Sequence, residues 1–147
     1  MSDEKSATDQ GVHGKIQLEL VTPAKRVLSQ QVDSVQAPGA EGSFGVLPGH
    51  TDFLSLLKPG ELVATTGTQT QRFAVGEGFV QVSRNKVLVL AETADRYEDL
   101  NSETAKAEVD AETAKLAALK QDSADYELQR AKVERAAARA FVAGRKG

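Results

Sequence analysis

The chain has 147 residues, of which 40% are hydrophobic and 27% are charged, and its formal net charge is −3. This length predicts one domain, or one domain with a small appendage. The negative charge argues against a nucleic-acid binder or a protein held on an anionic membrane, and the lack of cysteine excludes disulfides and thiolate chemistry. Residues 1–14 have no apolar segment of a signal peptide, and no apolar run reaches membrane-spanning length, so a soluble cytosolic protein is expected.

Residues 1–14 are expected to form a disordered polar tail, and residues 15–94 a β-sandwich domain. Ile16, Leu18 and Leu20 occupy alternate positions, which is the period of a half-buried strand. Turn sequences rich in glycine and proline follow at short intervals, a pattern that favours an antiparallel sandwich or barrel over a parallel sheet. Further strands are predicted at residues 27–28, 32–37, 43–47, 53–57, 61–66, 71–75, 79–82 and 87–91.

The segment from Gly42 to Gly60 contains four glycines and two prolines among large apolar side chains. Glycine permits positive φ and close backbone approach, while proline fixes φ and donates no backbone hydrogen bond. The segment is therefore expected to turn sharply several times while it directs apolar groups inward. It is interpreted as a corner that defines the β-structure.

The composition changes at residues 91–95, and residues 95–147 are predicted to form an antiparallel helical hairpin. Asp95, Glu98 and Asp99 are interpreted as the acidic start of the first helix. Either Asp122 or Ser123 could cap a second helix that runs to about Ala143. One face of the first helix is predicted to carry the residues Leu100, Thr104, Ala107, Ala111, Ala114 and Ala118.

The hairpin is expected to dock weakly. Residues 95–123 contain eight acidic and four basic residues, and residues 124–147 contain three acidic and six basic ones, so the helices attract each other modestly. Their apolar faces are mostly alanine, however, and an alanine seam removes little apolar area from water. The hairpin is therefore predicted to be a mobile element.

Catalytic chemistry is not indicated by the sequence. The two histidines, His13 and His50, stand apart from one another, and no pattern of a metal site, a nucleophile elbow or a phosphate-binding loop is present. We therefore expect no enzymatic activity, no cofactor and no metal. His50, in a Pro-Gly-His turn, is interpreted as a packing or turn-bonding residue.

Arg135 and Arg139 lie four residues apart, which places them on one face of the second helix. Two interpretations are open. They can form a solvated basic face, or they can belong to a surface for an acidic partner or a nucleotide phosphate.

The motifs of this sequence resemble those of the epsilon subunit of bacterial and chloroplast-type rotary ATP synthases. The resemblance covers residues 15–143 and is strongest in Gly42-x-x-Gly-x-Leu-Pro-Gly-His-Thr51 and the following Leu56-Leu-Lys-Pro-Gly60. It continues through Gly76-x-Gly78, the segment 87–94 and the alanine-rich helical pair.

This resemblance implies a flattened sandwich of about ten short antiparallel strands, followed by a C-terminal helical hairpin. It implies a non-catalytic rotor subunit of the central stalk, whose strand faces bind the gamma subunit. The contact with the c-ring loops is expected at Ala40, Glu41, Gly42, Ser43 and Phe44, with Ser43 at the tip, and His50 is expected on this c-ring and gamma side.

The resemblance also implies a regulatory hairpin that extends along gamma and inhibits ATP hydrolysis. Arg135 and Arg139 then face acidic loops of the beta subunits within the alpha/beta head. The protein is expected at the cytoplasmic face of the bacterial plasma membrane, where it meets the membrane only through the complex. Some members bind ATP through Ile/Leu-Asp-x-x-Arg-Ala, but Asn101 and Thr104 replace the acid and the arginine here, so weak or no ATP binding is expected.

Two other classes compete with this interpretation. One is a sandwich module for a sugar or peptide with a helical oligomerisation tail, which exposed aromatic side chains would favour. Phe44, Phe53, Phe73 and Phe79 all lie within apolar strands or turns, however, and are expected in the core. The other is a nucleic-acid binder that uses the basic last helix, which the net charge and the lack of interleaved aromatics disfavour.

Overall fold

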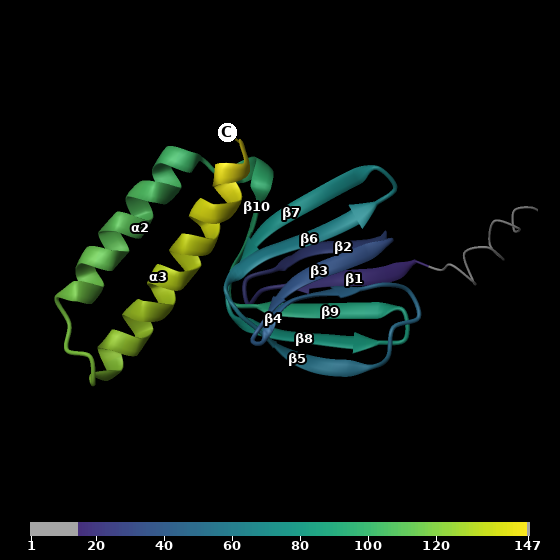
Figure 1. Ribbon diagram of the computed structural model, residues 1–147, viewed down its shortest axis with the longest axis horizontal. Helices are drawn as coiled ribbons and strands as arrows, with labels where there is room; N and C mark the ends of the chain where they lie inside the picture. Colours follow the sequence, from purple (N-terminus) through teal and green to yellow (C-terminus); the bar gives the residue numbers. More distant parts are fainter. Residues whose placement is uncertain (1–14, 147) are drawn as a thin grey trace, which may run out of the picture.

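The computed structural model describes residues 15–146, and the tail predicted for residues 1–14 lies outside them. Strands come first in this part of the chain and helices follow (Figure 1). The strands are β1 (Ile16–Val21), β2 (Arg26–Val32), β3 (Ser34–Gly39), β4 (Gly42–Val46), β5 (Phe53–Leu57), β6 (Gly60–Thr66), β7 (Gln69–Val75), β8 (Gly78–Ser83), β9 (Lys86–Ala91) and β10 (Ala94–Arg96). The helical elements are η1 (Tyr97–Asp99), α2 (Ser102–Ala117), α3 (Ala124–Ala143) and η2 (Gly144–Lys146).

The strands form a sandwich in the order β10-β7-β6-β3-β5-β8-β9-β1-β2, with β4 paired to β3. The two layers are linked where β3 meets β5 through the single pair Gly39 and Leu57. Neighbouring strands are antiparallel, as predicted, except that β1 and β9 run parallel. This arrangement confirms the predicted all-β sandwich followed by two helices.

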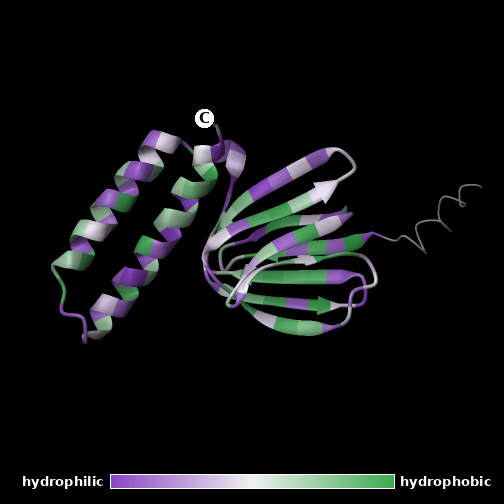
Figure 2. Cartoon of the chain, viewed as in Figure 1, coloured by the Kyte–Doolittle hydropathy of each residue, from purple (hydrophilic) through white to green (hydrophobic). Residues whose placement is uncertain are grey.

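The core lies between the layers, and the period-two alternation explains which side chains fill it. Ile16, Leu18 and Leu20 of β1 are fully buried, while the residues between them are half-buried. Phe73 of β7 is 1% exposed and is among the largest side chains of this core. Figure 2 shows the hydrophobic residues running along the strands of the sandwich.

The approach to the helices differs from the prediction. Asp95 does not start a helix: it lies in β10, which pairs with β7 through Asp95 and Ala74. Tyr97–Asp99 form a 3₁₀ turn, and α2 begins only at Ser102, after Asn101 accepts a hydrogen bond from the backbone N–H of Thr104. A strand of three residues leaves no local period in the sequence, because its pairing partner lies about twenty positions away in the chain.

The second helix begins where the sequence indicates, because Ser123 is the cap and its side chain accepts a hydrogen bond from the backbone N–H of Tyr126. The predicted inner face of α2 is wrong. Its members from Thr104 to Ala118 are exposed, and the buried or half-buried residues of α2 are Ser102, Ala105, Glu108, Val109, Glu112 and Leu116. The face of α2 that meets α3 includes two glutamates, which accept hydrogen bonds from α3, so the spacing of apolar residues alone does not indicate which side of the helix is buried.

The α3 helix lies between α2 and the sandwich and packs on β6 and β7 (Figure 1). The apolar contact is small: Ala138 and Val142 of α3 meet Ala74 of β7, and Tyr97 and Leu100 pack beside them. This cluster is separate from the core of the sandwich. The seam therefore buries mainly small side chains, which agrees with the alanine-rich sequence.

Candidate functional site

Four large apolar side chains stand on the outer face of the sandwich, and we call them the apolar strip: Leu54 and Leu56 of β5, Phe79 of β8 and Leu90 of β9. Their exposed fractions are 67%, 55%, 49% and 45%. Leu56 is paired with Phe79, and Phe79 with Leu90, so three of them form one row across adjacent strands. Exposed apolar side chains gathered on adjacent strands are typical of an interaction surface.

Phe79 was expected in the core, and this expectation is wrong. Val80 and Val82 point inward and are at most 3% exposed, so the alternation of β8 turns Phe79 outward. The strip could have been found from β5, whose sequence Phe-Leu-Ser-Leu-Leu carries leucine on both faces. A strand that faces water on one side normally has polar residues there.

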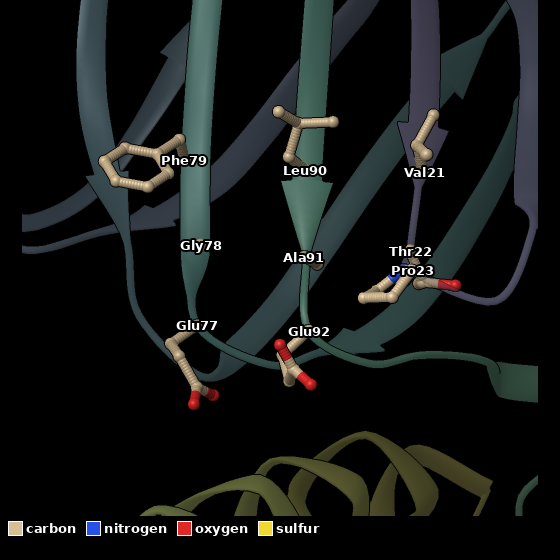
Figure 3. A pocket seen from close by; sticks show the side chains of 9 residues that line it. All are labelled: Val21, Thr22, Pro23, Glu77, Gly78, Phe79, Leu90, Ala91 and Glu92. Carbon is tan, nitrogen blue, oxygen red and sulfur yellow. The ribbon is translucent and has the colours of Figure 1, made fainter.

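The strip continues into a shallow hollow at the end of β8 and β9 that faces α3. Figure 3 shows Phe79, Leu90 and Val21 standing on neighbouring strands, with Glu77 and Glu92 beyond the strand ends. The remaining lining residues are Thr22, Pro23, Gly78 and Ala91. The hollow therefore combines an apolar wall with two carboxylates next to the helical hairpin.

Gly78 allows the strands to approach closely at this place. A Cβ atom built on Gly78 would collide with the backbone carbonyl of Leu90, so no other residue fits without moving β9. Gly78 pairs with Leu57 of β5 and with Ala91 of β9. The lack of a side chain at Gly78 thus permits the close approach of β8 and β9 beside the hollow.

The predicted ring-contact turn projects from the sandwich between β3 and β4. Gly39 and Gly42 form the last pair of these strands, so the tip consists of Ala40 and Glu41, both exposed. The prediction that Ser43 lies at the tip is wrong, because Ser43 lies in β4 opposite Pro38. Gly42 has a φ of 126°, which L-residues rarely adopt, and it sets the conformation of this turn.

Phe44 and His50 lie at the base of the same turn. The Phe44 ring covers Gly39 and meets the Phe53 ring edge to face, with the ring centroids 5.4 Å apart. His50 is exposed, its ring lies 5.3 Å from that of Phe53, and its backbone N–H donates to the carbonyl of Leu47. His50 thus closes a turn and packs beside an aromatic ring.

Arg135 and Arg139 do not form a solvated face, since their side chains are only 18% and 19% exposed. Arg135 donates to Glu77 at 2.7 Å, which ties α3 to the edge of the hollow. Arg139 donates two hydrogen bonds to Glu108 of α2, at 3.0 and 2.8 Å, and lies 3.5 Å from a carboxylate oxygen of Asp95.

The environment of Arg139 favours its charged form. Burial by itself lowers the pKa of the guanidinium, but the hydrogen bonds that Arg139 donates to Glu108 and the charges of Glu108 and Asp95 outweigh burial, so its pKa is raised. In this conformation the chain's own carboxylates therefore hold both arginines.

The segment that corresponds to the ATP motif has a structural role here. Asn101 caps α2 and accepts from the N–H of Thr104 through its side chain, and Ala105 is buried. Neither Asn101 nor Thr104 offers a charged group to a nucleotide phosphate.

Among residues 15–146 no cluster of three metal-ligating side chains occurs. No helix in this described range has the length and apolar character needed to cross a membrane.

Comparison with known sequences identifies the relatives of the chain. Residues 15–97 match the family described as ATP synthase, Delta/Epsilon chain, beta-sandwich domain. The chain is 46% identical over 129 residues to the ATP synthase epsilon chain of Anaeromyxobacter sp. strain K, a match that covers 87% of this chain and 97% of the relative. It is 44% identical over 131 residues to the ATP synthase epsilon chain of Geobacter metallireducens, covering 89% and 95%.

Solved structures share the fold. A chain of the Euglena gracilis mitochondrial ATP synthase, solved with OSCP, F1 and c-ring, aligns with a TM-score of 0.73 at 22% identity and covers 88% of this chain and 81% of that one. A chain of the Tetrahymena thermophila mitochondrial ATP synthase central stalk and c-ring aligns with a TM-score of 0.59 at 19% identity, covering 88% and 96%. At these identities the likeness concerns the fold.

Proposed function

The chain belongs to the family of ATP synthase epsilon chains, and on this premise we propose that it is the central-stalk rotor subunit that joins gamma to the c-ring and restrains ATP hydrolysis. Membership of the family makes it a subunit of ATP synthase that is not itself catalytic. The proposal assigns a partner to each surface of the sandwich and a regulatory role to the hairpin.

The apolar strip is the proposed site for gamma, and its exposure is the observation that carries the proposal. Four large apolar side chains, each 45–67% exposed, lie on adjacent strands and the hairpin does not cover them. Association with a partner removes such surface from water, which is the main driving force of stable interfaces. The hollow beside Phe79 adds two acidic groups, Glu77 and Glu92, at the rim of this interface.

The turn between β3 and β4 is the proposed contact with the polar loops of the c-ring. Ala40 and Glu41 are exposed at its tip, and Gly42 and Ser43 are exposed behind them. The tip is set by the close pair Gly39 and Gly42 and by the Phe44 ring that covers Gly39. His50, at the base, is proposed to border the same interface. Because the backbone of this short turn is already ordered, binding a partner there loses little conformational entropy.

The hairpin is the proposed inhibitory element. Its apolar contact with the sandwich consists mainly of Ala74, Ala138 and Val142, which is small for an element of this length. After release, Arg135 and Arg139 would be available to acidic loops of the beta subunits in the alpha/beta head. The subunit would then act at the cytoplasmic face of the bacterial plasma membrane, in contact with the membrane only through the complex.

Co-purification tests the assembly part of the proposal. The full chain, expressed with the gamma subunit of the same organism, should form a stoichiometric complex that survives gel filtration. Truncation after Leu100 removes α2 and α3 but leaves the apolar strip, so the complex should form equally well.

The truncation also tests inhibition separately. ATP synthase assembled with the truncated chain should hydrolyse ATP faster than the enzyme with the full chain. A normal complex with an unchanged hydrolysis rate would refute the inhibitory role alone. Failure of the full chain to bind gamma would refute the rotor assignment.

A further inference from the structure

Three arginines near the end of the chain each reach a carboxylate of the sandwich. Arg135 and Arg139 belong to α3, and Arg145 belongs to η2. Their partners on the sandwich come from three different places in the chain: Glu77 before β8, Asp95 in β10 and Glu61 in β6. We call these three pairs the electrostatic clamp.

The pair of Arg145 and Glu61 has the most favourable geometry. Arg145 donates two parallel hydrogen bonds to the Glu61 carboxylate, each 2.7 Å long. The Glu61 side chain is only 11% exposed, and Arg72 donates to it from the other side at 3.0 Å. The Arg145 guanidinium also lies over the Phe141 ring, 5.2 Å from its centroid. Two-point pairing and partial burial both strengthen such a bond.

The clamp surrounds the small apolar cluster of the seam. The buried side chains Ala138 and Val142 lie on the same side of α3 as Arg135 and Arg139, and Arg145 follows in the next turn. Because the apolar cluster is small, even modest charged pairs add appreciably to the attraction between α3 and the sandwich. Charges that are partly exposed are screened by salt, whereas apolar contacts are not.

We propose that the electrostatic clamp, closed by Arg145 and Glu61, holds the hairpin on the sandwich and makes its release sensitive to ionic strength and to competing acidic surfaces. This inference deepens the proposed function, because Arg135 and Arg139 are also the groups proposed to meet the beta subunits. The sandwich carboxylates and an acidic loop of beta then compete for the same guanidinium groups. Arg145 and Glu61 act only in the docked state.

A thiol probe on the isolated full chain tests the clamp, since the protein has no cysteine of its own. Val142→Cys places a single thiol at a position that is 0% exposed in the seam, and Ala138→Cys is a second probe, at 6%. When opening and closing are fast, the rate of labelling by a thiol reagent reports the population with the hairpin released. Val80→Cys, buried in the sandwich core, reports global unfolding instead.

Arg145→Gln in the Val142→Cys background should speed labelling about fivefold, the factor expected for loss of one partly exposed ion pair. Arg130→Gln is the matched control, because within residues 15–146 the ion pairs of Arg130 are with Glu127 and Glu134 of its own helix. It should leave the rate unchanged. Labelling of Val80→Cys should stay far slower than labelling of Val142→Cys in every variant, because the sandwich core opens only on global unfolding.

Salt gives an independent readout. Raising potassium chloride from about 0.01 M to about 1 M shortens the screening length from about 30 Å to about 3 Å, and should speed labelling of Val142→Cys severalfold. Arg145→Gln should reduce this response. Equal labelling rates for Arg145→Gln and Arg130→Gln, or a rate independent of salt, would overturn the clamp. Either result would leave the hydrolysis test of the inhibitory hairpin unaffected.

Discussion

Replacing Phe79 by alanine tests the apolar strip, because this side chain lies at its centre, paired with Leu56 on one side and Leu90 on the other. A phenylalanine side chain has on the order of 200 Å² of surface, and 49% of Phe79 is exposed. Complete cover by gamma would therefore remove about 100 Å² from water. At about 25 cal/mol per Å², this area contributes about 2.5 kcal/mol to binding.

Alanine keeps the Cβ atom, so the expected loss is about 2 kcal/mol, or roughly 30-fold in Kd. The Kd for the purified gamma subunit, measured by titration with labelled Phe79→Ala and wild type, gives this ratio directly. Phe141→Ala is the matched control: Phe141 is also a phenylalanine, is 60% exposed and lies on α3, away from the strip. It should bind gamma with nearly the wild-type Kd.

The stability of the free protein must be separated from binding. Phe79 is half exposed, so Phe79→Ala should still fold, and thermal unfolding of the isolated variant checks this. If the folded Phe79→Ala variant binds gamma as tightly as Phe141→Ala does, the strip is not the gamma interface. Equal losses for both variants would mean that exposed aromatic surface in general, and not this strip, decides binding.

The remaining predictions concern the hairpin, pH, one glycine and ATP. Arg135→Glu combined with Arg139→Glu should weaken inhibition of ATP hydrolysis in the assembled enzyme, whereas Arg130→Glu should not. Full inhibition by the double variant would mean that these arginines have only a structural role. Burial opposes ionisation of Glu61, but hydrogen bonds from Arg145 and Arg72 outweigh it, so the pKa of Glu61 lies below its ordinary value of 4.5. Ionised Glu61 therefore stabilises the folded chain above pH 4.5, and this contribution is lost as the pH falls through the lowered pKa. The difference in the free energy of urea unfolding between wild type and Glu61→Gln should therefore shrink on acidification. A difference that does not change with pH would contradict this. Gly78→Ala should destabilise the protein by about 3 kcal/mol because its Cβ collides with the backbone of β9, while Gly45→Ala, whose Cβ meets nothing closer than 3.9 Å, should change thermal stability by less than about 1 kcal/mol; similar losses would show that the clash is relieved. Isothermal calorimetry of the isolated chain with ATP should show weak or no binding, because Asn101 and Thr104 replace the acid and the arginine of the ATP motif, and micromolar affinity would contradict this expectation.

Much of the fold could be predicted from the sequence because its signals are local. Alternation in Ile16, Leu18 and Leu20 marks a strand wherever that strand pairs, and Ser123 caps α3 through a bond to a residue three positions away. The alanine-rich composition predicts helices with small side chains in the seam, and the seam has them. The glycine and proline turns of residues 42–60 carried the family resemblance for the same reason.

What the tertiary structure decided depends on contacts between distant residues. The β10 strand exists because Asp95 pairs with Ala74, and Phe79 is exposed because no other part of the described chain covers the outer face of β8. The partners of Arg135 and Arg145 lie 58 and 84 positions away, at Glu77 and Glu61. A local pattern records which residues a helix carries, but whether a basic face meets water or a carboxylate depends on the surface that folding brings against it.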